Sequence, residues 1–412
     1  MKGRKILIKT TKIILICSVI LFLTGCTSEF NSFPTPEEDN NNSLILEDYV
    51  SENNIGNEIE LFPEHIIDNE NDILKVDADV IIPSDINNTQ ELRIYKSDYN
   101  IWNDEIIVNT MIEEGLVPTD GIIDIDRKTY DNEFNNGQEI VSYGLNNDCS
   151  IAFSCGSVFF STYKSVRNQY NHVFDYYKNY INEKGLTELL TDEEIKGISR
   201  IDALDKTSRI LQLLGLSDKV LPPQVYPLKH EIVNKINKEE NATNKYGEGV
   251  TILEENDDAY LIFYPVVTDN IPSSNIFANG ANEILDCSKV FFIYSNEGII
   301  EIYVSGIMSE TEVLKSSQII SPVKAVNILS DSYSDILTDT RISVSLIKLV
   351  SIQRKVFKEN TTDFYTEPVW LLYGKFTDTN DSENKKGLND TDAIAFVSAV
   401  TGEIIPVNSV GG

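Results

Sequence analysis

The stretch VFFIYSNEGIIEIYV, from Val290 to Val304, holds two apolar runs separated by a short polar turn. The runs Val290–Tyr294 and Ile299–Val304 are rich in β-branched and aromatic residues, which favour strands. The turn Asn296-Glu297-Gly298 contains a glycine, which readily adopts the left-handed backbone conformation of tight turns. The stretch therefore predicts an antiparallel β-hairpin.

This hairpin closes a unit that begins with a helix. Ser199–Asp202 resembles a capping box, in which the serine side chain accepts a hydrogen bond from the backbone at the start of a helix, and Gly215 ends the helix. Strands are predicted at Val250–Glu254 and Tyr260–Val267, before the hairpin. The apolar stripe of the predicted helix comprises Ile201, Leu204, Leu211 and Leu214.

The same order of elements recurs toward the carboxyl end. Ser321 is the predicted cap of a helix, and Pro322 stands at the first helical position, which tolerates its missing N–H. The expected buried face of this helix comprises Val323, Val326, Leu329, Tyr333 and Ile336. Strands at Val344–Val356 and Val369–Phe376 follow, and then a closing hairpin of Ala393–Val400, the turn Thr401-Gly402 and Glu403–Val407.

The first part of the chain mixes the same two kinds of element. Asn103 is the predicted cap of a helix that buries Ile106, Ile107 and Met111 and ends at Gly115. A longer helix is predicted over Lys164–Lys184, where apolar side chains recur at spacings of three and four. Strands are predicted at Val76–Ile82, Leu92–Tyr95, Gln138–Gly144 and Ser150–Ser161.

Together these patterns predict an α+β fold, with helices packed on curved antiparallel sheets in two or more helix-plus-hairpin units. Trp370 and Phe396 are expected on adjacent strands that face the helix capped by Ser321. The predicted segments are a leader (1–25), an acidic tether (26–71), an N-terminal domain (72–198), a central unit (199–320) and a C-terminal unit (321–412).

The leader has the features of a lipoprotein signal peptide. Five basic residues precede or flank an apolar run, Ile13–Leu23, whose 11 residues are fewer than the ~20 that a spanning helix needs. The run ends in Leu23-Thr24-Gly25-Cys26, where small residues expose the bond before Cys26 to a peptidase. Its thiol would carry diacylglycerol, and two acyl chains give a stable anchor. The sequence predicts attachment to the extracytoplasmic face of a cell membrane, in a Gram-positive organism if the many Ile, Asn and Lys residues reflect an AT-rich genome.

The charge of the chain limits its partners. Removing the leader removes five basic groups and no acidic ones, which takes the formal net charge from −31 to −36. So acidic a chain is repelled by nucleic-acid phosphates and by anionic headgroups, so we expect no nucleic-acid partner and a membrane contact made through the lipid alone. Thr27–Glu58 has eight carboxylates and no Lys or Arg, a composition that favours a disordered tether.

Several of these features occur together in known lipoproteins. The lipid-attachment motif, the acidic tether, the strand containing Pro368-Val369-Trp370 and the final Ala399–Ile405 stretch resemble an uncharacterised family of clostridial lipoproteins of unknown function. More loosely, the helix-then-hairpin units resemble the YycH and YycI regulators of an envelope sensor kinase, and PepSY-type domains. Those regulators are held by a membrane helix, whereas this chain has a predicted lipid anchor. The resemblance implies a regulatory envelope domain and supplies no catalytic residues.

Residues that carry chemistry are few. The three histidines, His65, His172 and His230, are isolated in the sequence, and no HExxH, CxxC, GxSxG or phosphate-loop motif is present. After lipidation three cysteines remain, Cys149, Cys155 and Cys287; either the first two bridge a hairpin, or all are buried thiols. The acidic stretches Asp120–Asp126 and Asp378–Glu383 lack the glycine and glutamate spacing of a calcium-binding EF-hand, so solvated loops are favoured over calcium sites.

The sequence therefore predicts a non-enzymatic, lipid-anchored envelope protein that binds or modulates another envelope protein, with no cofactor and no metal. The alternative is a ligand-capture lipoprotein associated with a transporter, although the alternating strand–helix pattern of a doubly wound binding protein is missing. A third hypothesis is a hydrolase whose Ser/His/Asp residues come together only in the fold.

Overall fold

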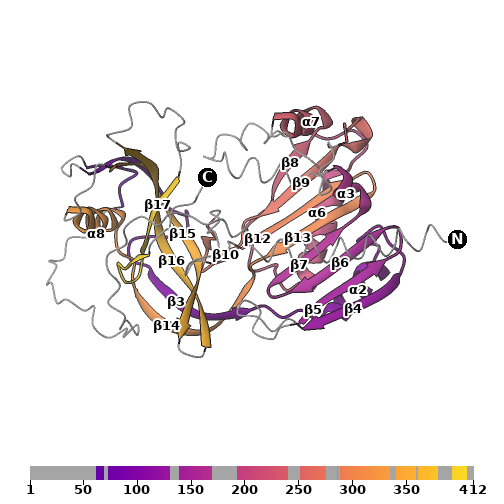
Figure 1. The fold of residues 1–412 in the computed structure, drawn as a ribbon, viewed down its shortest axis with the longest axis horizontal. Coiled ribbons are helices and arrows are strands. Elements are labelled where there is room, and N and C mark those ends of the chain that lie inside the picture. The colour runs from indigo at the N-terminus through magenta and orange to yellow at the C-terminus, as the bar shows by residue number, and fades with distance from the viewer. Residues whose placement is uncertain are drawn as a thin grey trace.

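The computed structural model of the protein describes residues 62–68, 73–129, 139–168, 193–239, 251–274, 285, 288–334, 340–358, 361–378 and 392–405. Strands account for 51% of these residues and helices for 21%. The strands form two large sheets that lie side by side as two lobes (Figure 1). The predicted α+β class is therefore wrong. The chain is mostly β, because its β-branched and aromatic runs build two wide sheets while the described part contains only five α-helices.

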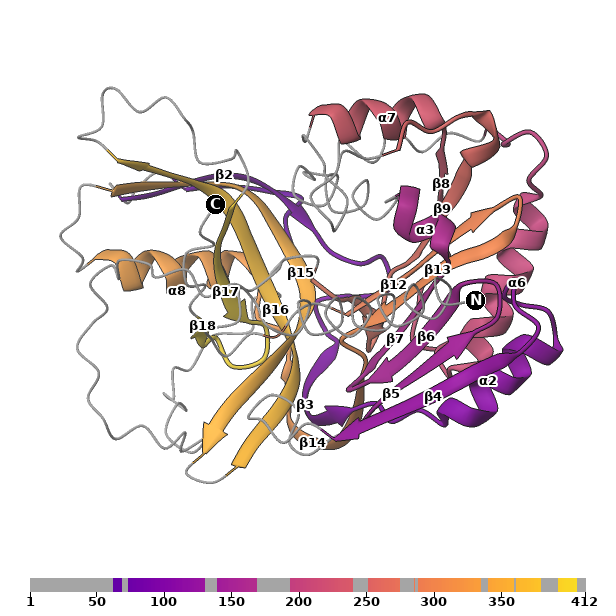
Figure 2. The ribbon, with the colours of Figure 1, turned by 45° about the vertical axis from the view of Figure 1, so that its right-hand side comes forward.

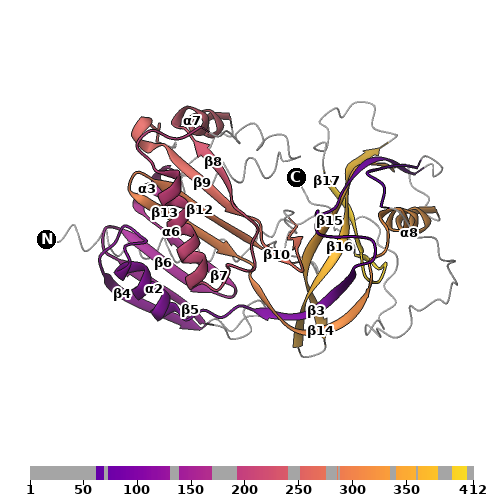
Figure 3. The same cartoon turned by 180° about the vertical axis from the view of Figure 1, so that it is seen from behind.

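Sheet B has eight strands in the order β4-β5-β6-β7-β13-β12-β9-β8, and every neighbouring pair is antiparallel. Helices α2 (Asp104–Glu113) and α6 (Arg200–Leu213) cover one face (Figure 3), and α7 (His230–Glu239) packs on the other through Val233. The strands are β4 (Ile122–Thr129), β5 (Glu139–Leu145), β6 (Cys149–Ser154), β7 (Ser157–Ser161), β8 (Gln224–Leu228), β9 (Ala259–Tyr264), β12 (Lys289–Ser295) and β13 (Gly298–Ser305). Shorter elements are α3 (Tyr163–Asn168), the 3-10 helix at Glu255–Asp257, β10 (Val267–Thr268) and β11 (Ile271–Pro272).

Sheet A also has eight strands, with the main order β1-β2-β15-β16-β17-β18. Strand β3 pairs with β16 and with β14, and only β2 and β15 run parallel. Helix α8 (Pro322–Ser334) lies along one face (Figure 2). The strands are β1 (His65–Asp68), β2 (Leu74–Ile81), β3 (Glu91–Tyr99), β14 (Met308–Gln318), β15 (Thr340–Lys358), β16 (Thr361–Asp378), β17 (Asp392–Ser398) and β18 (Ile404–Ile405).

One lobe is inserted into the other. The chain leaves sheet A after β3, builds all of sheet B, and returns through β14, which pairs with β3. We call residues 100–307 the inserted lobe, and residues 62–99 with 308–405 the discontinuous lobe. This division differs from the predicted units at 72–198, 199–320 and 321–412, since β7 pairs with β13 and β2 pairs with β15 across their boundaries.

The two crossing points between the lobes are fastened to each other by main-chain hydrogen bonds. Asn100 N–H donates to Ile307 O (3.0 Å), Ile307 N–H to Gly156 O (2.9 Å), and Gly156 N–H to Asn100 O (3.2 Å). Gly156 has φ +60°, and an added Cβ would lie 2.3 Å from Ile307 O. Glycine is required here because the turn between β6 and β7 closes against the returning chain.

The three predicted helix N-caps are confirmed. The side chains of Asn103, Ser199 and Ser321 each accept a hydrogen bond from a backbone N–H three residues on, at 3.3, 3.2 and 3.1 Å. The hairpin of the opening stretch is confirmed as β12 and β13, with Ser295 opposite Gly298. Three side chains predicted on the apolar faces of helices are instead exposed to solvent, namely Ile106 (60%), Ile201 (70%) and Val323 (38%). The prediction is wrong for these three residues. Residues 251–254, part of the predicted Val250–Glu254 strand, are not in a strand.

The two aromatic residues predicted to face α8, Trp370 and Phe396, lie on opposite faces of sheet A. Trp370 is fully buried with Val326 and Leu329 of α8, and its indole N–H donates to Ile320 O (3.0 Å), which confirms the prediction for this residue. Phe396 is also buried, but it lies in a different cluster with Leu371, on the other face of the sheet. The register pairs Trp370 with Val397 and Leu371 with Phe396, so the prediction for Phe396 is wrong by one residue.

Two other predictions concern segments that lie mostly outside the described residues. Of the helix predicted over Lys164–Lys184, the described part ends at Asn168 in α3, and 169–184 lie outside it. The predicted tether, 26–71, lies outside it too, apart from residues 62–68, of which His65–Asp68 forms β1. Among the described helices, none has the length and apolar character needed to cross a membrane.

Candidate functional site

The residues predicted for lipidation, Leu23, Thr24, Gly25 and Cys26, lie outside the described residues. Cys149 and Cys155 are free thiols, and burial raises the pKa of each to about 11, so neither is a reactive thiolate near neutral pH. Cys287 is not among the described residues.

The two described histidines are each held by carboxylates. His65 lies between Asp77 and Asp79 on β2, with contacts of 2.9 and 2.8 Å. At the start of α7, the Nδ1 atom of His230 lies 2.8 Å from Asp258 Oδ1 and its Nε2 atom 3.3 Å from Glu231 Oε1. In this arrangement both nitrogens of each ring contact a carboxylate, so neither ring is placed to activate a serine hydroxyl. His172 lies outside the described residues.

The acidic stretches do not form a metal site where they are described. Most of Asp120–Asp126 belongs to β4 rather than to a loop, which corrects the predicted solvated loop, and Asp378 ends β16 with 379–383 beyond the described residues. No group of three metal-ligating side chains occurs in the described ranges. The sequence signal for a strand was present, because Ile122–Asp126 partly alternates isoleucine with aspartate.

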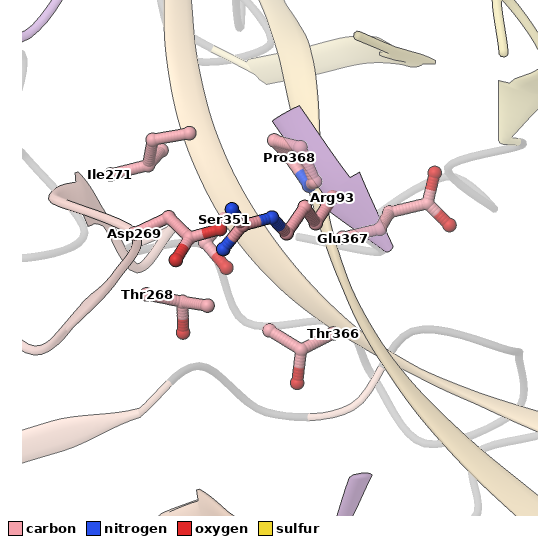
Figure 4. Close-up of a pocket in the computed structure, with 8 residues that line it drawn as sticks. All are labelled: Arg93, Thr268, Asp269, Ile271, Ser351, Thr366, Glu367 and Pro368. Atoms are coloured by element: carbon pink, nitrogen blue, oxygen red, sulfur yellow. The ribbon is translucent and has the colours of Figure 1, made fainter. Parts of the chain in front are cut away.

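A small cavity lies where the two lobes meet (Figure 4). It is lined by Arg93, Thr268, Asp269, Ile271, Ser351, Thr366, Glu367 and Pro368. In the close-up the Arg93 guanidinium points toward Asp269 and Ser351, whereas the Glu367 carboxylate points away. The cavity volume is about 10 Å³, close to the least that one water molecule occupies. This cavity therefore has no room for an organic ligand.

Polar contacts around this cavity join the lobes. The Tyr95 hydroxyl donates to Asp269 (2.7 Å), and Arg93 donates to the Tyr95 oxygen (3.3 Å). Burial raises the pKa of Tyr95, which keeps the hydroxyl protonated as a donor. The Gln353 amide donates to Ser288 Oγ (2.7 Å) and Gly306 O (2.6 Å) of the inserted lobe. The contacts span both sheets, so they fix the relative position of the lobes.

An ion pair is buried in sheet A beside the cavity. Arg354 on β15 donates to Glu367 on β16 (3.0 Å), and their side chains are 6% and 4% exposed. Arg354 also reaches Glu403, at 3.3 Å. Burial raises the pKa of Glu367, and the Arg354 charge opposes that shift. The pair lies in the sheet interior, so we assign it to folding and not to binding.

The most exposed strand of the inserted lobe is β4, at the edge of sheet B. None of its residues is buried, and Ile122, Ile123 and Ile125 are 36%, 62% and 51% exposed. The ladder to β5 contains a bulge between Ile122 and Asp124. An edge strand with exposed apolar side chains can pair with a strand from another chain.

A salt-bridge cluster holds β4 in place. Arg127 on β4 donates to Asp104 of α2 (2.8 Å) and to Glu139 of β5 (3.2 Å), and the Tyr143 hydroxyl donates to Asp104. The Asp124 carboxylate lies over Gly144, where a Cβ would be 2.0 Å from its Oδ1 atom. Arg127 and Asp124 thus hold β4 against β5 and α2, while the isoleucines of β4 remain exposed. We take the β4 edge as the candidate functional site.

No model of a known protein family matches this chain, and no curated protein matches it. An uncharacterised protein from Eubacterium rectale has a similar solved structure, with a TM-score of 0.57. The two chains are 19% identical, and the match covers 84% of this chain and 94% of that one. The similarity therefore establishes a shared fold and carries no function.

Proposed function

We propose that this protein is a lipid-anchored, extracytoplasmic envelope protein that binds another envelope protein through the β4 edge, without catalysis. The anchor rests on Leu23-Thr24-Gly25-Cys26 at the end of a short apolar run. Binding rests on one observation, the exposure of three isoleucines on an edge strand. No family or relative adds to either part.

The anchor gives a direct prediction. Replacing Cys26 with alanine is expected to abolish membrane retention of the mature protein, because the thiol is the only predicted point of lipid attachment. Membrane and soluble fractions of cells expressing each form give the measurement, with Cys149→Ala as a matched control that keeps the lipid. Equal membrane recovery of the Cys26→Ala variant and the wild type would contradict the anchor.

The chemistry of β4 indicates what kind of segment it accepts. Main-chain N–H and C=O groups along a strand edge give affinity, and side chains on alternate positions give selectivity. The isoleucines offer apolar contacts, whereas Asp126 is paired with Lys128 of the same strand (2.8 Å) and Asp124 lies over Gly144. The bulge and these charges also oppose pairing with arbitrary strands. An extended segment with apolar side chains at alternate positions fits this edge best.

The binding prediction uses matched isoleucine variants. Ile123→Lys and Ile125→Lys are expected to remove a crosslinked partner protein from the purified lipoprotein, because each puts a charge into the pairing edge. Ile201→Lys is the control, since Ile201 is 70% exposed but lies on α6. All three should change stability by no more than about 0.5 kcal/mol, as surface substitutions do. A partner retained by both β4 variants would contradict the assignment of the edge, and no crosslinked protein with wild type would contradict partner binding.

The alternative of a ligand-capture lipoprotein gains no support from the inter-lobe cavity, which has room for about one water molecule. The hydrolase hypothesis gains none from His65 and His230, whose ring nitrogens face carboxylates. We therefore favour protein binding over both.

A further inference from the structure

The first described segment, residues 62–68, belongs to the stretch predicted as a tether and lies along the edge of sheet A. We call it the strap. Its Phe62 ring packs 6.1 Å from the Trp370 ring, centroid to centroid, and Ile66 is 7% exposed in the core of sheet A. The Val80 N–H donates to Glu64 O (2.9 Å), next to the β1–β2 ladder. Within the described fold, the strap is thus the part nearest in sequence to the predicted lipidation site, Cys26.

Histidine 65 sits at the middle of the strap, with a carboxylate at each ring nitrogen. Nδ1 lies 2.8 Å from Asp79 Oδ1, and Nε2 lies 2.9 Å from Asp77 Oδ1. The register places His65 opposite Asp79 and Ile67 opposite Asp77, so the ring and both carboxylates share the outer face. A neutral imidazole has one N–H and can donate to only one carboxylate, whereas the imidazolium donates to both. The observed pair of contacts is complete only in the protonated ring.

Other charged groups around His65 come from the strap and from the neighbouring strands. Glu64 and Asp68 belong to the strap itself, and β2 adds Lys75 to the outer face beside the two aspartates. Beyond β2, the outer face of β15 carries Arg341 and Lys348. The two aspartates are the groups in direct contact with the ring, so they dominate its charge preference.

We propose that His65 is a proton-dependent latch that holds the strap on sheet A. Protonation closes the latch by completing both hydrogen bonds to β2, and deprotonation loses one of them. The latch needs only the fold, and its effect at the membrane rests on the proposed anchor. If the strap leaves β2, its seven residues add at most about 25 Å to the reach of the tether.

The direction of the pH effect follows from the ring's surroundings. The hydrogen bond to Asp79 is the largest cause that raises the pKa of His65 above its ordinary value of 6.5, and Asp77 adds to it. Because the pKa of His65 is higher in the folded state, the stabilisation from the latch is fully present below pH 6.5. It is lost as pH rises through the folded-state pKa of His65. Phe62 and Ile66 do not titrate, so the strength of their contacts does not change with pH.

Hydrogen exchange of the purified mature protein tests the latch. After correction for the intrinsic exchange rate, protection of the Val80 amide and the β1 amides should fall several-fold from pH 5.5 to pH 8.5. In His65→Gln, the same protection should be low and independent of pH, because glutamine carries no charge to gain. His230→Gln is the matched control in the other lobe and should behave as wild type. Equal pH dependence in His65→Gln and wild type would overturn the proposal.

A second measurement does not depend on the stability of any variant. An NMR titration of the wild-type His65 ring should give a pKa above 6.5, and Asp79→Asn should lower it more than Glu64→Gln does. A wild-type pKa at or below 6.5 would overturn the latch. Both tests observe the strap directly, so they can succeed or fail whether or not Cys26 carries lipid and β4 binds a partner.

Discussion

Replacement of Trp370 with alanine should lower the free energy of unfolding by roughly 3–5 kcal/mol, the range for deletion of a large buried aromatic side chain. Trp370 is fully buried between β16 and α8, in one of the largest clusters of the described core. The variant loses this packing, the contact with Phe62, and the hydrogen bond to Ile320 O. The loss of an exposed recognition residue would instead leave stability nearly unchanged.

Denaturant unfolding followed by circular dichroism gives the measurement, with two controls. Trp370→Phe keeps most of the apolar volume, so it should cost less than the alanine variant. Tyr163→Ala removes an aromatic side chain that is 65% exposed, so it should change stability by no more than about 0.5 kcal/mol. A loss below about 1 kcal/mol in Trp370→Ala would contradict the packing of α8 on this sheet.

Replacement of Arg354 with methionine should be similarly costly, by about 3–5 kcal/mol at pH 7, because it leaves the Glu367 carboxylate buried without its partner. The cost should be smaller near pH 4.5. Burial already raises the pKa of Glu367, and loss of the Arg354 charge raises it further. When the pKa of a carboxyl is higher in the folded state than in the unfolded state, its contribution to stability is fully present below the unfolded-state pKa. That contribution is lost as pH rises through the folded-state pKa.

A double-mutant cycle separates the charge effect from packing. Arg354→Met with Glu367→Leu removes both charges and should recover most of the lost stability, because apolar residues can replace a buried pair at little cost. Arg209→Met is the control, since its bidentate pair with Glu114 is 38% and 36% exposed and should contribute no more than about 1 kcal/mol. If Arg354→Met loses no more than Arg209→Met, the buried pair is not an important contributor to folding.

Local features of the fold could be predicted from the sequence, because each depends on residues that are close along the chain. The caps at Asn103, Ser199 and Ser321 each need one side chain and a backbone N–H three residues away. The hairpin of β12 and β13 needs only two apolar runs and a turn. These signals do not depend on which distant strand becomes a neighbour.

Strand partners could not be predicted in the same way. Strand β2 pairs in parallel with β15, where Leu74 lies opposite Ile342, and nothing in either strand specifies the other. The repeated helix-then-strands order therefore indicated separate units, whereas the strands combine into two sheets. Phe396 shows the sensitivity of register, because a shift of one residue puts a side chain on the opposite face.

The candidate site was only partly visible in the sequence. The Ile122–Asp126 stretch drew attention for its carboxylates, while its isoleucines became important only once β4 proved to be an edge strand. In the sequence His65 is an isolated histidine. Asp77 and Asp79 contact it only because β1 pairs with β2. Both cases need tertiary contacts that composition and spacing do not specify.

The insertion of one lobe into the other has a consequence for how the chain folds as it is made. Strands β1, β2 and β3 emerge first, but β14, β15 and β16, which pair with β2 and β3, follow only after residue 307. At ordinary rates of synthesis the delay is roughly 10–40 s, during which β2 and β3 lack those partners. The inserted lobe is continuous and its last strand, β13, ends at Ser305, so its sheet can close as β14 emerges and before β15 and β16 are made. Its folding then brings the crossing points at Asn100 and Ile307 together and shortens the search that joins β3 to β14.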